Sequence, residues 1–137
     1  MLELYVRQNM AVKKIMIEFG NVGVVEAELF DRVSPKTYDA FLKAMPFESN
    51  ANTWGEEIYF DTPVQMTSEN GKKKVEVGDI AYWPPGRSMC LFFGRTPAST
   101  GSEPVAASPV NVIGKITKNI ELLNKVEGDT GIKVKVA

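Results

Sequence analysis

Two adjacent carboxylates, Glu56 and Glu57, lie in the stretch NTWGEEIYF, with Trp54 before them and Tyr59 after them. A carboxylate beside aromatic rings can act as an acid or base, or can bind a cationic or amide-bearing ligand. The run EIYF predicts a strand, and neighbouring residues on a strand point to opposite faces. The two glutamates therefore cannot form one dyad unless the backbone bulges after the preceding glycine. The simpler alternative is that one is solvated and the other pairs with an arginine or a lysine.

A set of aromatic residues surrounds the same region of the predicted sheet. Its members are Trp54, Tyr82, Trp83, Phe92 and Phe93. They could line a pocket for a ring or a proline, or they could fill the core and ends of a barrel. One of Phe92 and Phe93 must face inward because the two are adjacent on a strand. Trp83, directly before two prolines, is expected on the surface or in a pocket.

Three further features carry a weaker chemical signal. Pro84-Pro85-Gly86 is a stiff turn that presents Arg87, which could bind a carboxylate or phosphate, although a simple connecting turn explains the prolines and glycine. Cys90 lies in an apolar run and is expected to be buried and inert, since no histidine activates it. The stretch 95–109 reads as a long loop, which is either a lid over the site or disordered.

The composition excludes several classes of function. The 137 residues contain no histidine, which removes Ser-His and Cys-His nucleophiles, imidazole acid-base chemistry and most zinc sites. We therefore expect no metal and no cofactor. The net charge of -1 gives no reason to expect nucleic acid or a membrane as partner. The start MLELYVRQNM lacks the layout of a secretion signal, and the single cysteine cannot form an internal disulfide, so a cytoplasmic protein is expected.

The apolar pattern predicts a single mainly β domain over residues 1–137. Strands are expected at 13–19, 23–29, 57–60, 64–67, 75–77, 79–83, 89–93, 110–116 and 132–136, and short helices after Ser34 and at 120–126. About eight strands with glycine and proline turns favour a barrel or a sandwich. The last strand could pair with the first and so remove both edges.

The segment SPKTYDAFLKAMP is the most regular helical pattern in the chain. Ser34 is a suitable N-cap, and Pro35 suits the first helical position. Apolar side chains follow at i, i+3, i+4 and i+7 from Tyr38, which places them on one face. Pro46 is expected to end the helix.

Several long motifs carry a resemblance to a known family. GVVEAELFDRVSPKTYDAF resembles the opening of cyclophilins, and VIGKI followed by a short helix and IKVKV resembles their C-terminal third. NTWGEEIYF, GDIAYWPPGRSMCLFFG and SPVNVIGKI look like a smaller bacterial and archaeal cyclophilin-like family of uncharacterised activity. The resemblance covers nearly the whole chain. It implies a closed eight-stranded β-barrel capped by two helices.

Cyclophilins are prolyl cis/trans isomerases. The resemblance therefore raises the question of whether this chain has the residues that the isomerase reaction needs. Their arginine donates to the prolyl nitrogen as the amide twists, and a hydrophobic pocket holds the ring. Glu57 takes the place of this arginine, and an ionised carboxylate can only accept hydrogen bonds. Gln65 matches a cyclophilin glutamine, but Leu91 replaces another. Val105 and Val110 replace the tryptophan and histidine of the family, which further weakens the isomerase pattern.

Three hypotheses follow for a groove between the Trp54–Phe60 strand and the Tyr82–Phe93 hairpin. The first is a non-enzymatic module that binds a peptide or small ligand. The second is a prolyl isomerase in which Arg87 or Arg95 replaces the missing arginine. The third is a metal-free enzyme with Glu57 as acid or base. The candidate ligand-binding residues are Trp54, Glu56, Glu57, Tyr59, Gln65, Tyr82, Trp83, Arg87, Leu91, Phe93 and Arg95.

Overall fold

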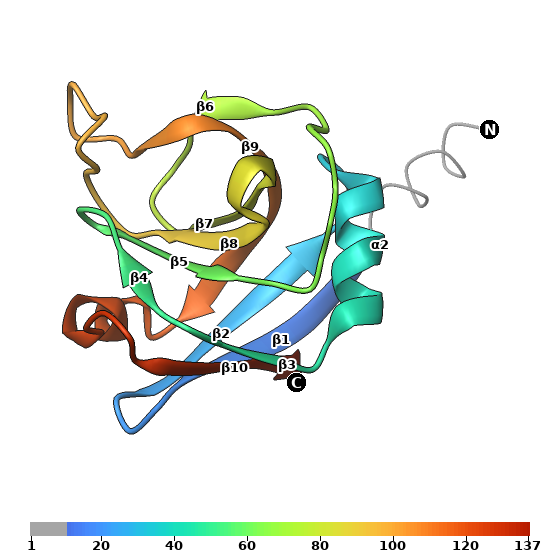
Figure 1. Ribbon diagram of the computed structural model, residues 1–137, viewed down its shortest axis with the longest axis horizontal. Coiled ribbons are helices and arrows are strands. Elements are labelled where there is room, and N and C mark those ends of the chain that lie inside the picture. The colour runs from blue at the N-terminus through green and yellow to red at the C-terminus, as the bar shows by residue number, and fades with distance from the viewer. Residues whose placement is uncertain (1–10) are drawn as a thin grey trace.

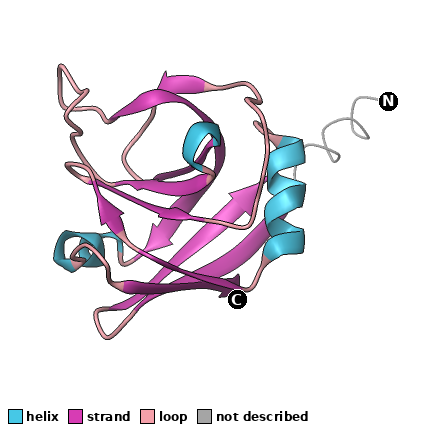
Figure 2. Cartoon of the chain, viewed as in Figure 1, coloured by secondary structure: helices cyan, strands magenta, loops and turns pink. Residues whose placement is uncertain are grey.

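A computed structural model describes residues 11–137, which form a mainly β structure with one α-helix (Figures 1 and 2). The segment in which no secretion signal was expected lies outside these residues. The strands are β1 (Val12–Phe19), β2 (Gly23–Phe30), β3 (Phe47–Asn50), β4 (Asn52–Thr53), β5 (Glu57–Asp61), β6 (Lys72–Lys74), β7 (Asp79–Trp83), β8 (Ser88–Phe92), β9 (Val105–Lys118) and β10 (Gly131–Val136). The helices are α2 (Pro35–Ala44) and the short 3-10 helices η1 (Pro84–Gly86) and η2 (Ile120–Lys125). Within the described part, no helix has the length and apolar character needed to cross a membrane.

All the strands belong to one ten-stranded sheet. Its order is β3-β10-β1-β2-β9-β7-β8-β5-β4, and β6 pairs with β9 beside this path. The predicted pairing of the last strand with the first is confirmed, because β10 runs antiparallel to β1 with Val134 opposite Ile17. The predicted closed eight-stranded barrel is wrong, because the hydrogen-bonded path ends at β3 and β4. These two end strands have the polar sequences FESN and NT, which lack the apolar alternation by which strands are recognised.

The irregular middle of the chain differs from the prediction in three places. The segment 64–67 is not a strand, because its backbone bonds to a side chain: the Tyr82 hydroxyl donates to the Val64 carbonyl at 2.8 Å and accepts from the Met66 N–H at 3.1 Å. The strand expected at 75–77 lies earlier, at β6. Residues 105–109 are not loop but the start of β9, whose small residues and proline conceal the strand pattern.

The predicted helix is confirmed as α2, but its first turn is capped differently from the expectation. The Ser34 side chain makes no cap bond within the helix. The carboxylate of Glu69 instead accepts from the backbone N–H groups of Lys36 and Thr37, both at 2.9 Å, and from the Thr37 hydroxyl at 2.8 Å. Burial alone would raise the pKa of Glu69, but these hydrogen bonds lower it overall. A distant loop therefore supplies the cap and ties the segment before β6 to the helix.

The sheet has an apolar cluster on each face. The larger, interior cluster includes Ile58, Phe60, Ile80, Tyr82 and Leu91, and α2 packs Phe41 into it. The smaller cluster lies on the opposite face of β5, β8, β7 and β9. Its buried members are Phe30, Val75, Ala81, Cys90, Phe92, Ala106, Val110 and Val112. Because residues alternate between these faces, each of the four strands supplies both the interior core and a second, outer surface.

Gly114 marks a close approach of β9 to β2, and Gly114→Ala is expected to destabilise the protein by about 3 kcal/mol. An added Cβ would overlap the carbonyl oxygen of Glu28 and lie 3.1 Å from the Leu29 Cα, so the backbone itself would have to move. Chemical denaturation measures the free energy of unfolding. Gly128→Ala is the matched control, because nothing lies within 4 Å of its added methyl group. Equal stability of the two variants would contradict the close approach.

Candidate functional site

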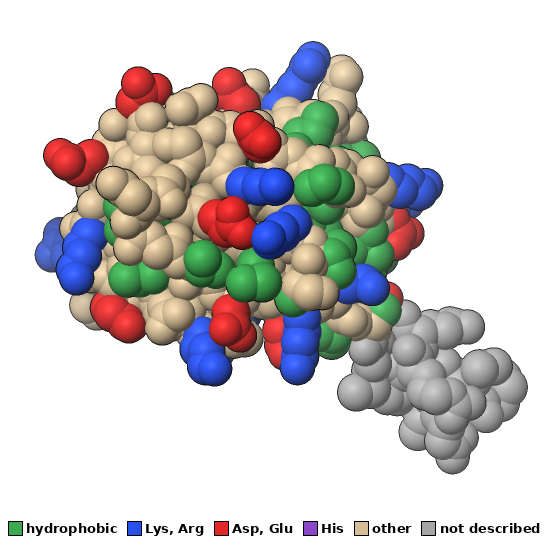
Figure 3. Space-filling view, turned by 90° about the horizontal axis from the view of Figure 1, so that it is seen from below, with side chains coloured by type: hydrophobic (Ala, Val, Ile, Leu, Met, Phe, Trp, Pro, Cys, Tyr) green, Lys and Arg blue, Asp and Glu red, His purple; other side chains and the backbone are tan. Residues whose placement is uncertain are grey.

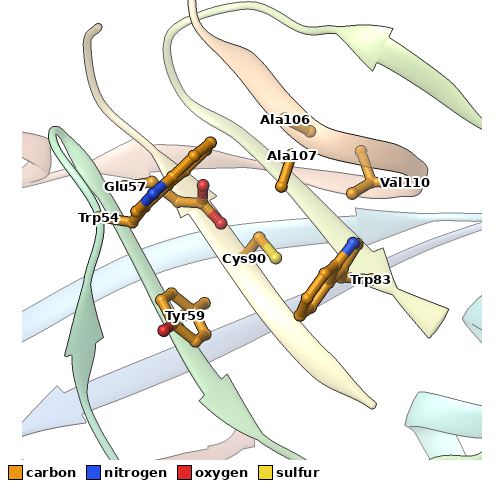
Figure 4. Close-up of a pocket in the computed structure, with 8 residues that line it drawn as sticks. All are labelled: Trp54, Glu57, Tyr59, Trp83, Cys90, Ala106, Ala107 and Val110. Atoms are coloured by element: carbon orange, nitrogen blue, oxygen red, sulfur yellow. The ribbon is translucent and has the colours of Figure 1, made fainter. Parts of the chain in front are cut away.

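A pocket of about 120 Å³ opens on the outer face of the sheet, beside the smaller apolar cluster (Figure 4). Strands β5, β7 and β8 form its floor, and the first part of β9 forms one wall. The lining residues are Trp54, Glu57, Tyr59, Trp83, Cys90, Ala106, Ala107 and Val110. Its position agrees with the predicted groove between the Trp54–Phe60 strand and the Tyr82–Phe93 hairpin, with β9 added as a wall.

Strand register brings the polar and aromatic groups of the floor together. Glu57 and Tyr59 are two residues apart on β5 and so share one face. Cys90 of β8 lies opposite Tyr59 on one side and Ala81 of β7 on the other. Figure 4 shows the Glu57 carboxyl group and the Cys90 thiol between the indole rings of Trp54 and Trp83.

Glu57 is a buried carboxyl group whose side chain faces the pocket. The residue is 6% exposed. Burial raises the pKa of Glu57 to about 7, although the neighbouring Cys90 thiol, as a hydrogen-bond partner, acts in the opposite direction. No salt bridge to Glu57 is formed by any residue in the described range 11–137. The pocket therefore holds a carboxyl group whose pKa lies near neutral pH and which has no salt-bridge partner among residues 11–137.

Cys90 is buried and free, as predicted. Burial raises its pKa well above its ordinary value, and the nearby Glu57 raises it further. The thiol therefore remains protonated at neutral pH, where thiols are poor nucleophiles. Its part in the pocket is that of a small apolar surface and a weak hydrogen-bond donor to Glu57.

The two tryptophans are held by different contacts. The indole N–H of Trp83 donates to the Ser108 hydroxyl at 2.6 Å, which fixes the ring against the start of β9. The backbone N–H of Trp54 donates to the Glu57 carbonyl at 2.9 Å and closes a tight turn. Gly55 in this turn has a φ of +61°, and a Cβ there would lie 2.9 Å from the Arg95 carbonyl oxygen. The turn thus needs glycine, and it places Trp54 over the pocket.

The adjacent glutamates are separated, as strand geometry predicted. Glu56 is exposed, whereas Glu57 is buried. The Glu56 carboxylate accepts from the backbone N–H of Arg95 at 3.1 Å, and the Glu56 N–H donates to the Arg95 carbonyl at 2.7 Å. Glu56 therefore ties its own turn to the loop after β8, and it bonds the backbone of Arg95 there.

The remaining predicted site residues do not line this pocket. Tyr82 and Leu91 lie in the interior core because alternation along β7 and β8 turns them inward. Phe93 is half-buried and packs against that same core. The other three, Gln65, Arg87 and Arg95, are exposed. Any role of these residues in ligand binding stays a prediction.

Four lining residues were not among the predicted ligand-binding set. Cys90 lies on the same face of β8 as Phe92. Strand alternation would therefore have predicted Cys90 in the groove if Phe92 had been assigned to the outer face. Val110 occupies the position of the cyclophilin histidine in the resemblance, which was also a pointer to the groove. Ala106 and Ala107 lie in a stretch of small residues that resembles a loop and carries no such signal.

Comparison with known proteins identifies the family of this chain. The chain belongs to the cyclophilin-like family, whose family model matches residues 13–135. It is similar to the solution structure of a hypothetical protein from Archaeoglobus fulgidus, with 42% sequence identity and a TM-score of 0.81. That match covers 93% of this chain and 97% of the archaeal one. Among curated proteins, none matches this sequence.

Proposed function

We propose that this protein is a binding module that holds a peptide or small ligand in the outer-face pocket. The observation that carries the proposal is the placement of Glu57. It is buried and faces the pocket, at the position where the resemblance to cyclophilins implies the catalytic arginine. The aromatic walls are suited to an apolar ring, and the carboxyl group is suited to one hydrogen-bonding or charged group.

The pocket does not favour the isomerase alternative. That reaction needs a fixed donor near the prolyl nitrogen. Arg87 and Arg95 are exposed and do not line the pocket, and the Arg95 guanidinium bonds the Ser99 carbonyl at 3.4 Å. The side-chain donors that remain among the described wall residues are the Trp54 indole N–H, the Tyr59 hydroxyl, the Cys90 thiol and the protonated form of Glu57.

A metal-free enzyme with Glu57 as acid or base is the second candidate. The observation that favours it is the pKa of Glu57, which burial raises to about 7. A general acid or base works best when its pKa lies near the operating pH. Burial raises the pKa of the Cys90 thiol well above its ordinary value, so this thiol is a poor partner in proton transfer, and we expect that partner to come from the ligand.

Our proposal keeps the predicted cytoplasmic location and the prediction that nucleic acid is not a partner. A cytoplasmic location is supported by the single free, buried thiol of Cys90. On the face seen in Figure 3, basic and acidic side chains are interspersed. Such a face gives no electrostatic footprint for nucleic acid, in line with the net charge of -1.

An NMR titration with short proline-containing peptides tests the binding proposal. The chain has two tryptophans and both line the pocket, so its two indole N–H signals report on the site directly. We expect both signals to shift, without exchange broadening of the peptide cis and trans signals at catalytic protein levels. Trp83→Ala should weaken binding about tenfold or more. Arg87→Ala is the control and should bind as the wild type does.

Different outcomes separate the three functions. Exchange broadening that disappears in Arg87→Ala or Arg95→Ala would establish the isomerase and overturn the binding-only proposal. If no peptide shifts the indole signals, a thermal-shift screen of small metabolites follows. Turnover of a hit that is lost in Glu57→Gln would favour the acid-base enzyme.

A further inference from the structure

The pocket wall combines aromatic rings and one carboxyl group, and none of the described residues that line it is basic. We propose that its ligand carries an alkylated ammonium group, such as a quaternary amine, held between Trp54, Trp83 and Glu57. This inference rests on the proposed binding function and names the chemical class of the ligand. It is carried by three features of the wall: the faces of the rings, the unpaired carboxyl group and the aliphatic remainder.

The rings supply the first feature. The face of an aromatic ring attracts a cation, and tryptophan does so most strongly. Figure 4 shows the indoles of Trp54 and Trp83 on either side of the carboxyl group, with the Tyr59 ring along a third side. Trp83 is held in place by its bond to Ser108 at 2.6 Å, so the cage is partly formed before a ligand enters. Several rings around a cation are the usual recognition mode for quaternary ammonium groups.

The carboxyl group supplies the charge. A buried carboxylate is costly unless a positive group pairs with it. The titratable groups among the described lining residues are Glu57, Tyr59 and Cys90, and none of these is a cationic side chain. No lysine or arginine in the range 11–137 forms a salt bridge with Glu57. A cationic ligand would supply the missing partner.

The remaining wall selects among cations. Ala106, Ala107 and Val110 present methyl groups, and the cavity measures about 120 Å³. A primary ammonium has three N–H donors and is strongly hydrated, so it would lose water without enough acceptors here. An alkylated ammonium has few or no N–H groups and presents methyl groups of its own. It can therefore contact the aliphatic wall, the rings and the carboxylate together.

Cation binding is linked to the ionisation of Glu57. Burial raises its pKa to about 7, and a bound cation favours the charged form. Affinity should therefore rise with pH up to about 7 and level off above it, with a loss of up to about tenfold for each pH unit below 7. The other titratable groups that line the pocket are Tyr59 and Cys90. Burial and the neighbouring Glu57 raise the pKa of the Cys90 thiol well above its ordinary value, so we expect Glu57 to control the dependence.

A matched pair of probes tests the inference. Choline and 3,3-dimethylbutan-1-ol have nearly the same shape, but only choline is charged. Titrations at pH 8, at constant ionic strength, follow the tryptophan fluorescence and the two indole N–H signals. We expect choline to bind about tenfold or more tightly than the neutral isostere. Glu57→Gln should reduce that preference, leaving the part due to the rings, and should remove its pH dependence, whereas Glu56→Gln, an exposed neighbour outside the pocket, should keep both.

The outcomes distinguish this inference from the proposed function. Equal binding of choline and the alcohol would overturn the ammonium inference and leave the binding pocket standing. Binding of proline peptides without any binding of choline or tetramethylammonium would do the same. If neither the ammonium probes nor the peptides move the indole signals, both the inference and the peptide-binding proposal are wrong. A charge preference as large in Glu57→Gln as in the wild type would also overturn the inference, since the carboxylate would then contribute nothing to it.

Discussion

Glu57→Gln is expected to abolish a pH-dependent loss of stability of about 3 kcal/mol. Burial raises the pKa of Glu57 from its ordinary value of 4.5 to about 7. Between these two values the folded protein keeps this proton, whereas the unfolded chain has lost it. The free energy of unfolding contributed by Glu57 is therefore fully present below pH 4.5. It falls as the pH rises towards 7 and stays low above that.

Urea denaturation of the wild type and the variant at pH 4.5 and pH 8 measures this effect. The quantity to compare is the wild-type minus variant difference, because burial also raises the pKa of Asp79 and adds a dependence of the same sign. Glu56→Gln is the matched control, since Glu56 is exposed and adjacent in sequence. In Glu56→Gln the unfolding free energy should change with pH as it does in the wild type. A difference between wild type and Glu57→Gln that does not change with pH would show that Glu57 ionises normally.

Asn111→Ala is expected to cost about 4 kcal/mol of unfolding free energy. The residue is completely buried within β9. Its amide N–H groups donate to the Thr37 hydroxyl at 3.1 Å and to the Thr67 carbonyl at 3.0 Å, and its amide oxygen accepts from the Glu69 N–H at 2.8 Å. Truncation removes the partner of the Thr67 carbonyl and of the Glu69 N–H and opens a small void, whereas the Thr37 hydroxyl keeps its bond to the Glu69 carboxylate. The loop that caps α2 would lose its anchor in the sheet.

The experiment is thermal and urea denaturation of Asn111→Ala, with amide hydrogen exchange at α2 as a second measurement. Asn124→Ala is the control, because its side chain is exposed and makes one local bond to the Glu121 carbonyl at 3.4 Å. The control should lie within about 0.5 kcal/mol of the wild type. Exchange at the first turn of α2 should speed up in Asn111→Ala, since the Glu69 cap depends on this anchor. An unchanged exchange rate at this turn would show that the Glu69 cap does not depend on the hydrogen bonds of Asn111.

The resemblance to cyclophilins implies an arginine at the position of Glu57, and a glutamate in that position would invert the chemistry expected of the groove. An arginine in this position supplies a permanent positive donor, whereas Glu57 supplies a group that is neutral or negative depending on pH. The surrounding wall acts in the same sense as Glu57, because the aromatic faces of Trp54 and Trp83 also attract positive charge. The carboxyl group and the rings together support our proposal of cation recognition more than stabilisation of a twisted amide.

The sequence by itself determined the features that depend on local pattern. Alternating apolar residues indicated β1, β2 and β10, and the pairing of β10 with β1 is confirmed. The 3.6-residue spacing and the flanking prolines indicated α2. Strand alternation predicted that Glu56 and Glu57 are separated, and they are, although Glu56 lies in the turn before β5 and only Glu57 is on the strand. The long motifs also identified the cyclophilin-like family.

The tertiary structure decided what depends on contacts between distant segments. The sheet ends at β3 and β4, whose polar residues pair only because β10 and β5 present backbone partners. Glu69, far from α2 in sequence, caps that helix. The wall formed by Ala106 and Ala107 follows from the return of β9 across the outer face. The pKa of Glu57 likewise depends on burial by these strands, since desolvation is a property of the packed molecule and no local pattern encodes it.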